Sequence, residues 1–304
     1  MNVLSLFDGI SCGQIALEKV GIKVDSYYAS EIDEKAIKIT QINYPNTTQI
    51  GDVIKVKGLD LPNIDLLIGG SPCQGFSFAG KQLNFEDERS KLFFEYARLL
   101  KETKPKYFLL ENVKMKKEYQ DIISEYLGVT PIKINSVITS AQRRDRLYWT
   151  NIPVKENIVD KNIKLIDILD VNVHDSYFIK DEAFNKLVEL RDGVISVRNL
   201  NNKFLPIEHG DGIILSRTWQ TYMPIIKEKS HCIRAMNPND IGVVINDNGN
   251  IRIRKFTENE IEKLQTIPID YTYGLSSLQR KRVCGNGYTV DVIAHILSFI
   301  PNIC

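Results

Sequence analysis

A short apolar run that ends in glycines and a cysteine constrains this chain most. Residues 63–68 (NIDLLI) form a strand-like stretch, and residues 69–77 (GGSPCQGFS) follow it directly. An apolar run bounded in this way is typical of a short buried strand. The glycines, proline and polar residues around Cys73 make a poor core but a good platform for a nucleophile. Because reacting groups of α/β proteins lie at the carboxyl edge of a parallel sheet, the stretch predicts an α/β fold with Cys73 in its site.

The chain opens with a second strand-and-turn unit. Residues 3–7 indicate a strand, 8–13 a glycine-bearing turn and 14–20 a helix. Such glycines let the backbone approach a ligand at the start of the helix. Glu31 ends the next strand, about twenty residues beyond the turn, which is the separation at which a carboxylate holds the ribose of a cofactor.

Charged side chains follow two later apolar runs. Glu111 comes directly after the strand-like residues 107–110, where desolvation favours the neutral, proton-donating form of a carboxyl group. Arg144 and Arg146 are two positions apart in an extended stretch and are expected to point to the same face. Two guanidinium groups there could hold a base carbonyl or a phosphate.

The composition is that of an ordinary globular protein. The chain has 304 residues, of which 43% are hydrophobic and 25% charged, enough for one larger and one smaller domain. A formal net charge of +1 does not favour a protein that coats phosphates unspecifically. The basic residues gather instead in 143–146, 252–255 and 280–282, which are three candidate phosphate-facing clusters.

The five cysteines are odd in number, widely spaced and without a C-x-x-C pair. This pattern opposes a disulfide framework and a zinc site. The sequence also starts without a basic leader, and no apolar run approaches the ~18 residues of a membrane span. We therefore expect a cytoplasmic protein that has no membrane partner and binds no metal.

The pattern changes between residues 162 and 250, where turn residues are frequent and strand-like pieces are short. We expect this span to form a separate small domain. Near its end, Asn248-Gly249 is a favoured two-residue hairpin turn. Thr257 and Glu260 then have the spacing of a capping box at the start of a helix over 258–265.

Taken together, the motifs resemble those of the cytosine-C5 DNA methyltransferases, including bacterial, phage and Dnmt3-type members. They occur in the family's order and cover about residues 1 to 150 and 250 to 304: LFDGISCG, ASEID, GDV, GGSPCQGFS, ERSKLFFEYARLL, ENV, QRRDR, RKFTENEIEKLQTIP and GNGYTVDVIAHI. The resemblance implies an α/β, Rossmann-like S-adenosylmethionine-dependent methyltransferase sheet with a second, smaller target-recognition domain. Residues 1–161 plus 251–304 would form the catalytic and cofactor-binding domain, and 162–250 the target-recognition domain.

The resemblance also implies a role for each site residue. Cys73 would add to C6 of a flipped-out cytosine, Glu111 would act at N3, and Arg144 and Arg146 would act at O2. S-adenosyl-L-methionine would be the cofactor and no metal is required. The residues expected to bind this cofactor are Phe7, Asp8, Gly9, Ile10, Gly13, Glu31, Ile32, Asp52, Val53, Pro72, Leu92, Asn286, Gly287 and Tyr288.

Double-stranded DNA is the expected partner, bound by a monomer, and the family also allows a cognate restriction endonuclease in the same system. Three other functions stay open. A tRNA methyltransferase of the Dnmt2 kind shares the motifs, although Gly75-Phe76-Ser77 favours DNA because the RNA branch usually has Pro-Phe-Thr. A catalytically silent DNA-binding regulator would not need Cys73, Glu111, Arg144 and Arg146 together. A dinucleotide oxidoreductase is disfavoured by the incomplete G-x-G-x-x-G pattern.

Overall fold

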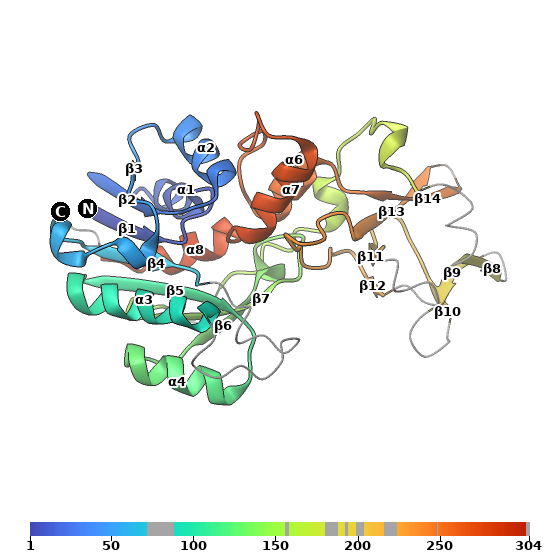
Figure 1. The fold of residues 1–304 in the computed structure, drawn as a ribbon. Helices are drawn as coiled ribbons and strands as arrows, with labels where there is room; N and C mark the ends of the chain where they lie inside the picture. The colour runs from blue at the N-terminus through green and yellow to red at the C-terminus, as the bar shows by residue number, and fades with distance from the viewer. Residues whose placement is uncertain are drawn as a thin grey trace. The chain divides into compact units, whose positions relative to one another are not determined.

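The computed structural model describes residues 1–71, 88–155, 158–179, 188–191, 194–198, 204–215, 224–247 and 249–301 (Figure 1). The chain divides into two compact units. Unit 1 comprises 1–135, 145–158 and 290–304, and unit 2 comprises 136–144 and 159–289. Within the described ranges, no helix has both the length and the apolar character needed to cross a membrane.

Unit 1 is built on a seven-stranded sheet with the strand order β3-β2-β1-β4-β5-β7-β6. The five strands β1 to β5 run parallel, whereas β7 is antiparallel to both of its neighbours. This confirms the predicted α/β class. The strands are β1 (Asn2–Leu6), β2 (Ser26–Ser30), β3 (Thr48–Gln49), β4 (Leu66–Gly69), β5 (Tyr107–Val113), β6 (Ile132–Asn135) and β7 (Asp145–Thr150).

Helices cover both faces of this sheet (Figure 1). On one face, Phe93, Tyr96 and Ile123 of α3 and α4 pack with Leu67 and Trp149 of the strands. On the other face lies α1, which the ion pair of Lys19 with Asp291 joins to α8 at 2.6 Å. The helices of unit 1 are α1 (Cys12–Lys19), α2 (Glu34–Asn43), α3 (Glu88–Thr103), α4 (Lys117–Leu127) and α8 (Val290–Leu297), with the short 3₁₀ turns η1 (Val53–Lys55) and η2 (Gly58–Asp60).

Unit 2 contains two small antiparallel sheets, β10-β9-β8 and β12-β11-β13-β14. The predicted hairpin is confirmed, because Asp247 pairs with Asn250 and Gly249 adopts a φ of 92°. The strands are β8 (Val188–Arg191), β9 (Val194–Arg198), β10 (Phe204–Pro206), β11 (Gly212–Ile214), β12 (Ile225–Ile226), β13 (Ile241–Asp247) and β14 (Asn250–Lys255), with the 3₁₀ turns η3 (Ser136–Ile138), η4 (Leu165–Ile168) and η5 (Asp175–Tyr177).

Two helices complete unit 2, α6 (Glu258–Leu264) and α7 (Ser277–Asn286). The predicted capping box at the start of α6 is confirmed: Glu260 N donates to the Thr257 hydroxyl at 3.1 Å, and Thr257 N donates to the Glu260 carboxylate at 2.8 Å. Unit 2 therefore extends beyond the span 162–250, because β14 pairs with β13 and leads directly into α6. The functional division into 1–161 plus 251–304 and 162–250 stays a prediction.

Three of the basic residues that were expected to face phosphates are buried. Arg254 is 2% exposed and donates to both oxygens of Glu260, which is fully buried, at 2.6 and 2.7 Å. Lys281 is 3% exposed and donates to the carbonyl of Phe256 at 2.7 Å. Arg144 is also buried. The expectation that these residues face phosphates is wrong, since their charges are satisfied inside the unit.

Replacing Arg254 tests whether this pair holds unit 2 together. We expect Arg254→Met to destabilise the protein by about 3 kcal/mol, because it leaves the Glu260 carboxylate buried without its counter-charge. Denaturant unfolding measures the change. Arg282→Met, at an exposed position of α7, is the control and should stay within about 0.5 kcal/mol of the parent. Equal midpoints for the two variants would contradict the role of the pair.

Candidate active site

The turn after β1 opens the carboxyl edge of the sheet. Phe7, Gly9 and Ser11 have φ values of 56°, 61° and 56°, so the chain reverses tightly before α1 begins. Gly9 suits this left-handed backbone, because it has no side chain to crowd it. Asp8 N donates to Ser30 O at 3.2 Å, which ties the turn to the end of β2.

Within the same segment, Ile10 is fully buried in the core. Gly13 lies in α1 against β2: a Cβ atom added there would lie 2.9 Å from the Tyr27 hydroxyl. Gly13 therefore permits the close packing of helix and strand. The predicted cofactor contacts of Ile10 and Gly13 stay predictions.

Glu31 braces the turn. Its carboxylate accepts hydrogen bonds from Gly9 N at 2.8 Å, Ile32 N at 2.7 Å and Asp33 N at 2.8 Å. The sequence indicated a ligand contact for Glu31 but gave no sign of this bracing role. A carboxylate has about four acceptor positions, so the side chain keeps room for a donor from a ligand.

A buried acid lies beneath the turn. The Asp8 side chain is only 5% exposed and accepts a hydrogen bond from the Tyr27 hydroxyl at 2.8 Å and another from the Ser11 hydroxyl. Burial raises the pKa of Asp8 to about 6, although these hydroxyl donors oppose the rise. A desolvated carboxyl group with a shifted pKa is typical of a functional site.

The loop after β3 reaches the same edge. Ser30 donates to Gly51 O at 2.7 Å, and Asp52 caps η1 by accepting from Ile54 N at 3.1 Å. Val53 is buried in the core, and Ile32 is 74% exposed. The structure thus brings the turn of Asp8, the end of β2 and the Asp52 loop together.

The ends of β4 and β5 form the other half of this edge. Gly69 pairs with Leu110, so Glu111 follows on the strand next to β4. Glu111 forms an ion pair with Arg146 of β7, with 2.9 Å between Oε1 and Nε, and the two side chains are 12% and 14% exposed. The fold thus places Glu111 and Arg146 in contact although they are far apart in the sequence. Both residues were predicted to be catalytic.

Asn112 was not singled out from the sequence, yet it holds the start of the loop after β4. It is 1% exposed, and its Nδ2 donates to the Ser71 hydroxyl at 3.2 Å. Its place in the sequence, between Glu111 and an apolar residue, was the available signal. Pro72 and Cys73 lie outside the described residues, so the nucleophile stays a prediction. Leu92 of α3 is half-buried against the core of unit 1.

Arg144 and Arg146 have different partners. Arg144 precedes β7, belongs to unit 2 and donates to the carbonyls of Gly287 at 3.0 Å and Ile233 at 3.3 Å. It is 5% exposed. Arg146 lies in β7 of unit 1 and pairs with Glu111. A contact between Arg144 and a base stays a prediction.

The last predicted cofactor residues lie at the end of α7 and directly after it, in unit 2. Asn286 is exposed, Gly287 accepts from Arg144, and Tyr288 is 7% exposed. The helix that comes next, α8, belongs to unit 1. Cofactor contacts of these three residues stay predictions.

The sheet order, with an antiparallel β7 and a glycine turn after β1, defines a Rossmann-like methyltransferase fold. The family model of the C-5 cytosine-specific DNA methylases matches residues 1–302. The chain belongs to this family. Members of the family share a fold that uses S-adenosylmethionine.

Two curated relatives match almost the whole chain. The type II methyltransferase M1.ScrFI of Lactococcus lactis subsp. cremoris is 31% identical over 96% of the chain and 76% of its own length. M.NlaX of Neisseria lactamica is 28% identical over 97% of the chain and 94% of its own length. The Dnmt2 methyltransferase of S. pombe has a similar fold, with a TM-score of 0.70, 18% identity and coverage of 98% and 97%.

The raised pKa of Asp8 predicts a pH-dependent stability. The folded protein keeps this proton up to about pH 6, whereas the unfolded chain loses it near 3.8, so stability falls as pH rises through this window. The loss is on the order of 3 kcal/mol. We expect Asp8→Asn to remove this dependence and to raise stability at neutral pH, because the Ser11 and Tyr27 hydroxyls can turn to suit an amide.

Denaturant unfolding on both sides of the window measures this effect. Asp60→Asn, at an exposed position of η2, is the control and should leave the pH profile of the parent unchanged. If the stability of Asp8→Asn depends on pH in the same way as that of the parent, Asp8 is not the group that causes this dependence.

Proposed function

We propose that this protein is a DNA (cytosine-5-)-methyltransferase. It would move a methyl group from S-adenosylmethionine to C5 of a flipped-out cytosine within a specific duplex sequence, through a covalent Cys73 adduct. The pairing of Glu111 with Arg146, on the strand beside the one that leads to Cys73, carries this proposal. A carboxyl group and a guanidinium held together suit the N3 and O2 positions of a cytosine ring.

The described residues of unit 1 fit the nucleoside part of the cofactor. A Cβ added at Gly9 would meet no atom within 4 Å, so the turn leaves open space beside its backbone. Glu31 keeps acceptor capacity for ribose hydroxyls, and the neighbouring Ile32 offers an exposed apolar side chain to a purine ring. Asp52 would accept from the adenine amino group. When bound, the cofactor would supply a methyl group on a sulfonium centre, from which a neutral thioether is a good leaving group.

The protein residues prepare the base for this transfer. Position C5 of cytosine is a poor nucleophile, and addition of the Cys73 thiolate to C6 converts the ring to an enamine. Glu111 would donate a proton or hydrogen bond at N3, and Arg146 would stabilise the charge at O2. After methylation, removal of the C5 proton by a base such as water lets the bond between Cys73 Sγ and C6 break, which restores the thiolate. A proton that Glu111 gave to N3 would return to its carboxylate in this step.

The span 162–250 would read the flanking sequence. Among its basic side chains, Arg234 is half-exposed but forms an ion pair with Asp240. Sequence choice would then depend on base-edge contacts more than on a general basic surface. Double-stranded DNA is the proposed partner of a cytoplasmic monomer, and the type II names of the relatives support a cognate restriction endonuclease.

A tRNA methyltransferase of the Dnmt2 kind is the second candidate. The similarity to the S. pombe structure favours it only at the level of the fold, because the identity is 18%. Gly75-Phe76-Ser77 and the type II relatives favour DNA. A silent regulator would have no need to keep Glu111 paired with Arg146 beside the Cys73 strand.

Transfer of labelled methyl groups tests the proposal directly. We expect label in duplex DNA and not in tRNA, with none above background for Cys73→Ser, because a hydroxyl is far less nucleophilic than a thiolate. The parent should also form a covalent adduct with duplex DNA containing 5-fluorocytosine, which the variant should lack. Label in tRNA alone would replace the proposal by the second candidate, and no label in either would favour the regulator.

Glu31→Ala tests the cofactor site. We expect S-adenosylmethionine binding to weaken by about 1 to 3 kcal/mol, because charge-assisted hydrogen bonds to the ribose are lost. Turnover at saturating cofactor should change less. Calorimetry measures the dissociation constant, and Glu34→Ala, at an exposed position of α2, serves as the control. An unchanged constant would leave Glu31 with its bracing role alone.

A further inference from the structure

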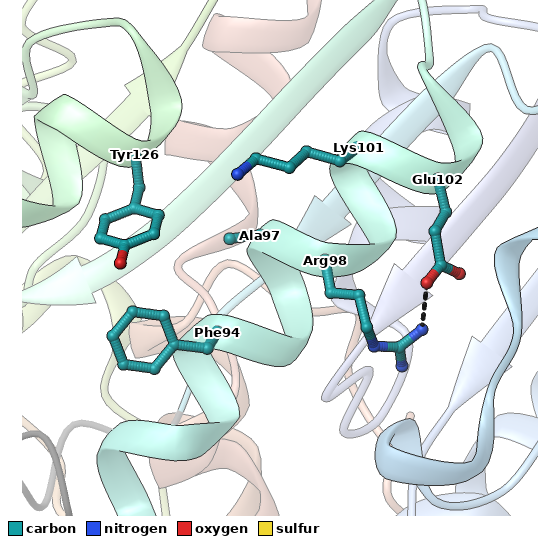
Figure 2. A pocket seen from close by; sticks show the side chains of 6 residues that line it. All are labelled: Phe94, Ala97, Arg98, Lys101, Glu102 and Tyr126. Atoms are coloured by element: carbon teal, nitrogen blue, oxygen red, sulfur yellow. Dashed lines mark hydrogen bonds and ion pairs between the residues drawn. The ribbon is translucent and has the colours of Figure 1, made fainter.

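A charged pair on α3, Arg98 and Glu102, has no role in the site described above. Figure 2 shows Arg98 and Glu102 on one side of α3 and Phe94 and Lys101 on its other side. Tyr126 of α4 lies beside Phe94 and Lys101. Together with Ala97 they line a surface depression of ≈ 370 Å³. The Arg98 side chain is 31% exposed and that of Glu102 is 30% exposed. From this position on α3, the side chains of the pair reach residues 53–58, the segment that follows Asp52.

Arg98 binds the backbone of the segment that follows Asp52. Its Nη2 donates to Val56 O at 2.9 Å and to Val53 O at 3.3 Å. The guanidinium is itself held by Glu102 at 2.8 Å and by Glu95 at 2.6 Å. The planar, multiply donating guanidinium is the side chain best suited to such a set of acceptors.

Glu102 binds the same segment from its other oxygen. Its Oε2 accepts from Gly58 N at 2.7 Å, and the hydrogen bond of Arg98 keeps the pKa of Glu102 below its usual range. A Cβ added at Gly58 would lie 2.6 Å from Cβ of Glu102, so only glycine allows this approach. Arg98 and Glu102 therefore form hydrogen bonds with one backbone N–H and two carbonyls of residues 53–58.

The segment has little regular structure of its own. It consists of η1 and η2, joined by single-turn hydrogen bonds such as Val56 N to Val53 O at 3.3 Å and Asp60 N to Lys57 O at 3.1 Å. Short 3₁₀ turns have poor hydrogen-bond geometry and do not fix their own position. The segment is fixed by the buried side chains of Val53 and Val56, by the hydrogen bond of Ser30 to Gly51 O just before it, and by the contacts to α3.

We propose that Arg98 and Glu102 are positioning residues for the cofactor. By holding residues 53–58, they set the place of Asp52 and Val53 at the carboxyl edge of the sheet, although neither touches the ligand. This inference rests on the proposed function, because Asp52 is the residue assigned there to the adenine.

Arg98→Met removes the donors and keeps most of the side-chain volume. We expect the dissociation constant and KM for S-adenosylmethionine to rise about tenfold. The kcat at saturating cofactor should stay within about twofold, because the reacting groups are untouched. Backbone amides of residues 53–61 should exchange hydrogen faster in the free protein. Arg98→Lys should recover part of the affinity, since one ammonium can still reach a carbonyl.

Lys101→Ala is the matched control. Lys101 lies on the same helix and lines the same depression, but its ammonium group lies over the Tyr126 ring. The cofactor affinity and the amide exchange of Lys101→Ala should therefore match those of the parent. Glu102→Gln is the second variant; it keeps an acceptor for Gly58 N and loses the charge that holds Arg98. We expect Glu102→Gln to weaken the binding of S-adenosylmethionine less than Arg98→Met does, and to change KM without changing kcat.

The outcomes separate the two proposals. If the parent binds the cofactor and both Arg98→Met and Glu102→Gln bind it equally well, the positioning role is wrong and the proposed function stands. If the parent does not bind the cofactor while the amides of residues 53–61 exchange faster in Arg98→Met than in the parent, the proposed function fails. The role of Arg98 in holding this segment would then still stand. A fall in kcat as large as the rise in KM would also overturn the positioning role.

Discussion

The parallel pairing of β1 with β2 and β4, and of β4 with β5, is the constraint on which the rest of unit 1 depends. Leu6 aligns with both Ser30 and Gly69, and Gly69 aligns with Leu110. Parallel strands end at one edge, so this register collects the turn of Asp8, the carboxylate of Glu31 and the pair of Glu111 with Arg146 there. A shift by one residue in any strand would turn these side chains to the opposite face.

Charge burial serves different purposes in the two units. In unit 2, Arg254 and Glu260 neutralise each other and join β14 to α6 through well-formed hydrogen bonds. In unit 1, Asp8 is buried with hydroxyl partners only, and burial raises the pKa of its carboxyl group to about 6. The first arrangement stabilises the fold, whereas the second costs stability at neutral pH. A protein keeps such a cost at a functional site more readily than elsewhere.

Neighbouring residues of one motif have separate structural roles. Gln142 Nε2 donates to Leu264 O at 3.0 Å and its Oε1 accepts from Ile233 N at 2.8 Å, which joins two segments inside unit 2. Arg144 acts in the same way through Gly287. Arg146, two residues later, is in unit 1 and holds Glu111. A short sequence spacing therefore does not imply a shared partner within the protein, because the chain passes from one unit to the other between Arg144 and Asp145.

The sequence by itself determined the α/β class, the glycine turn, the hairpin at Gly249 and the capping box at Thr257, because each depends on local backbone preference or on periodic burial. It also indicated Glu31 by its separation from the glycine turn, and Glu111 by its place after an apolar run. Arg144 and Arg146 were indicated by their alternation in an extended stretch. Only the tertiary structure decided that Arg254 and Lys281 are buried, that Arg144 binds carbonyls, and that Arg98 and Glu102 hold the loop of Asp52. These depend on tertiary contacts, most of them between residues far apart in the chain, which no local pattern encodes.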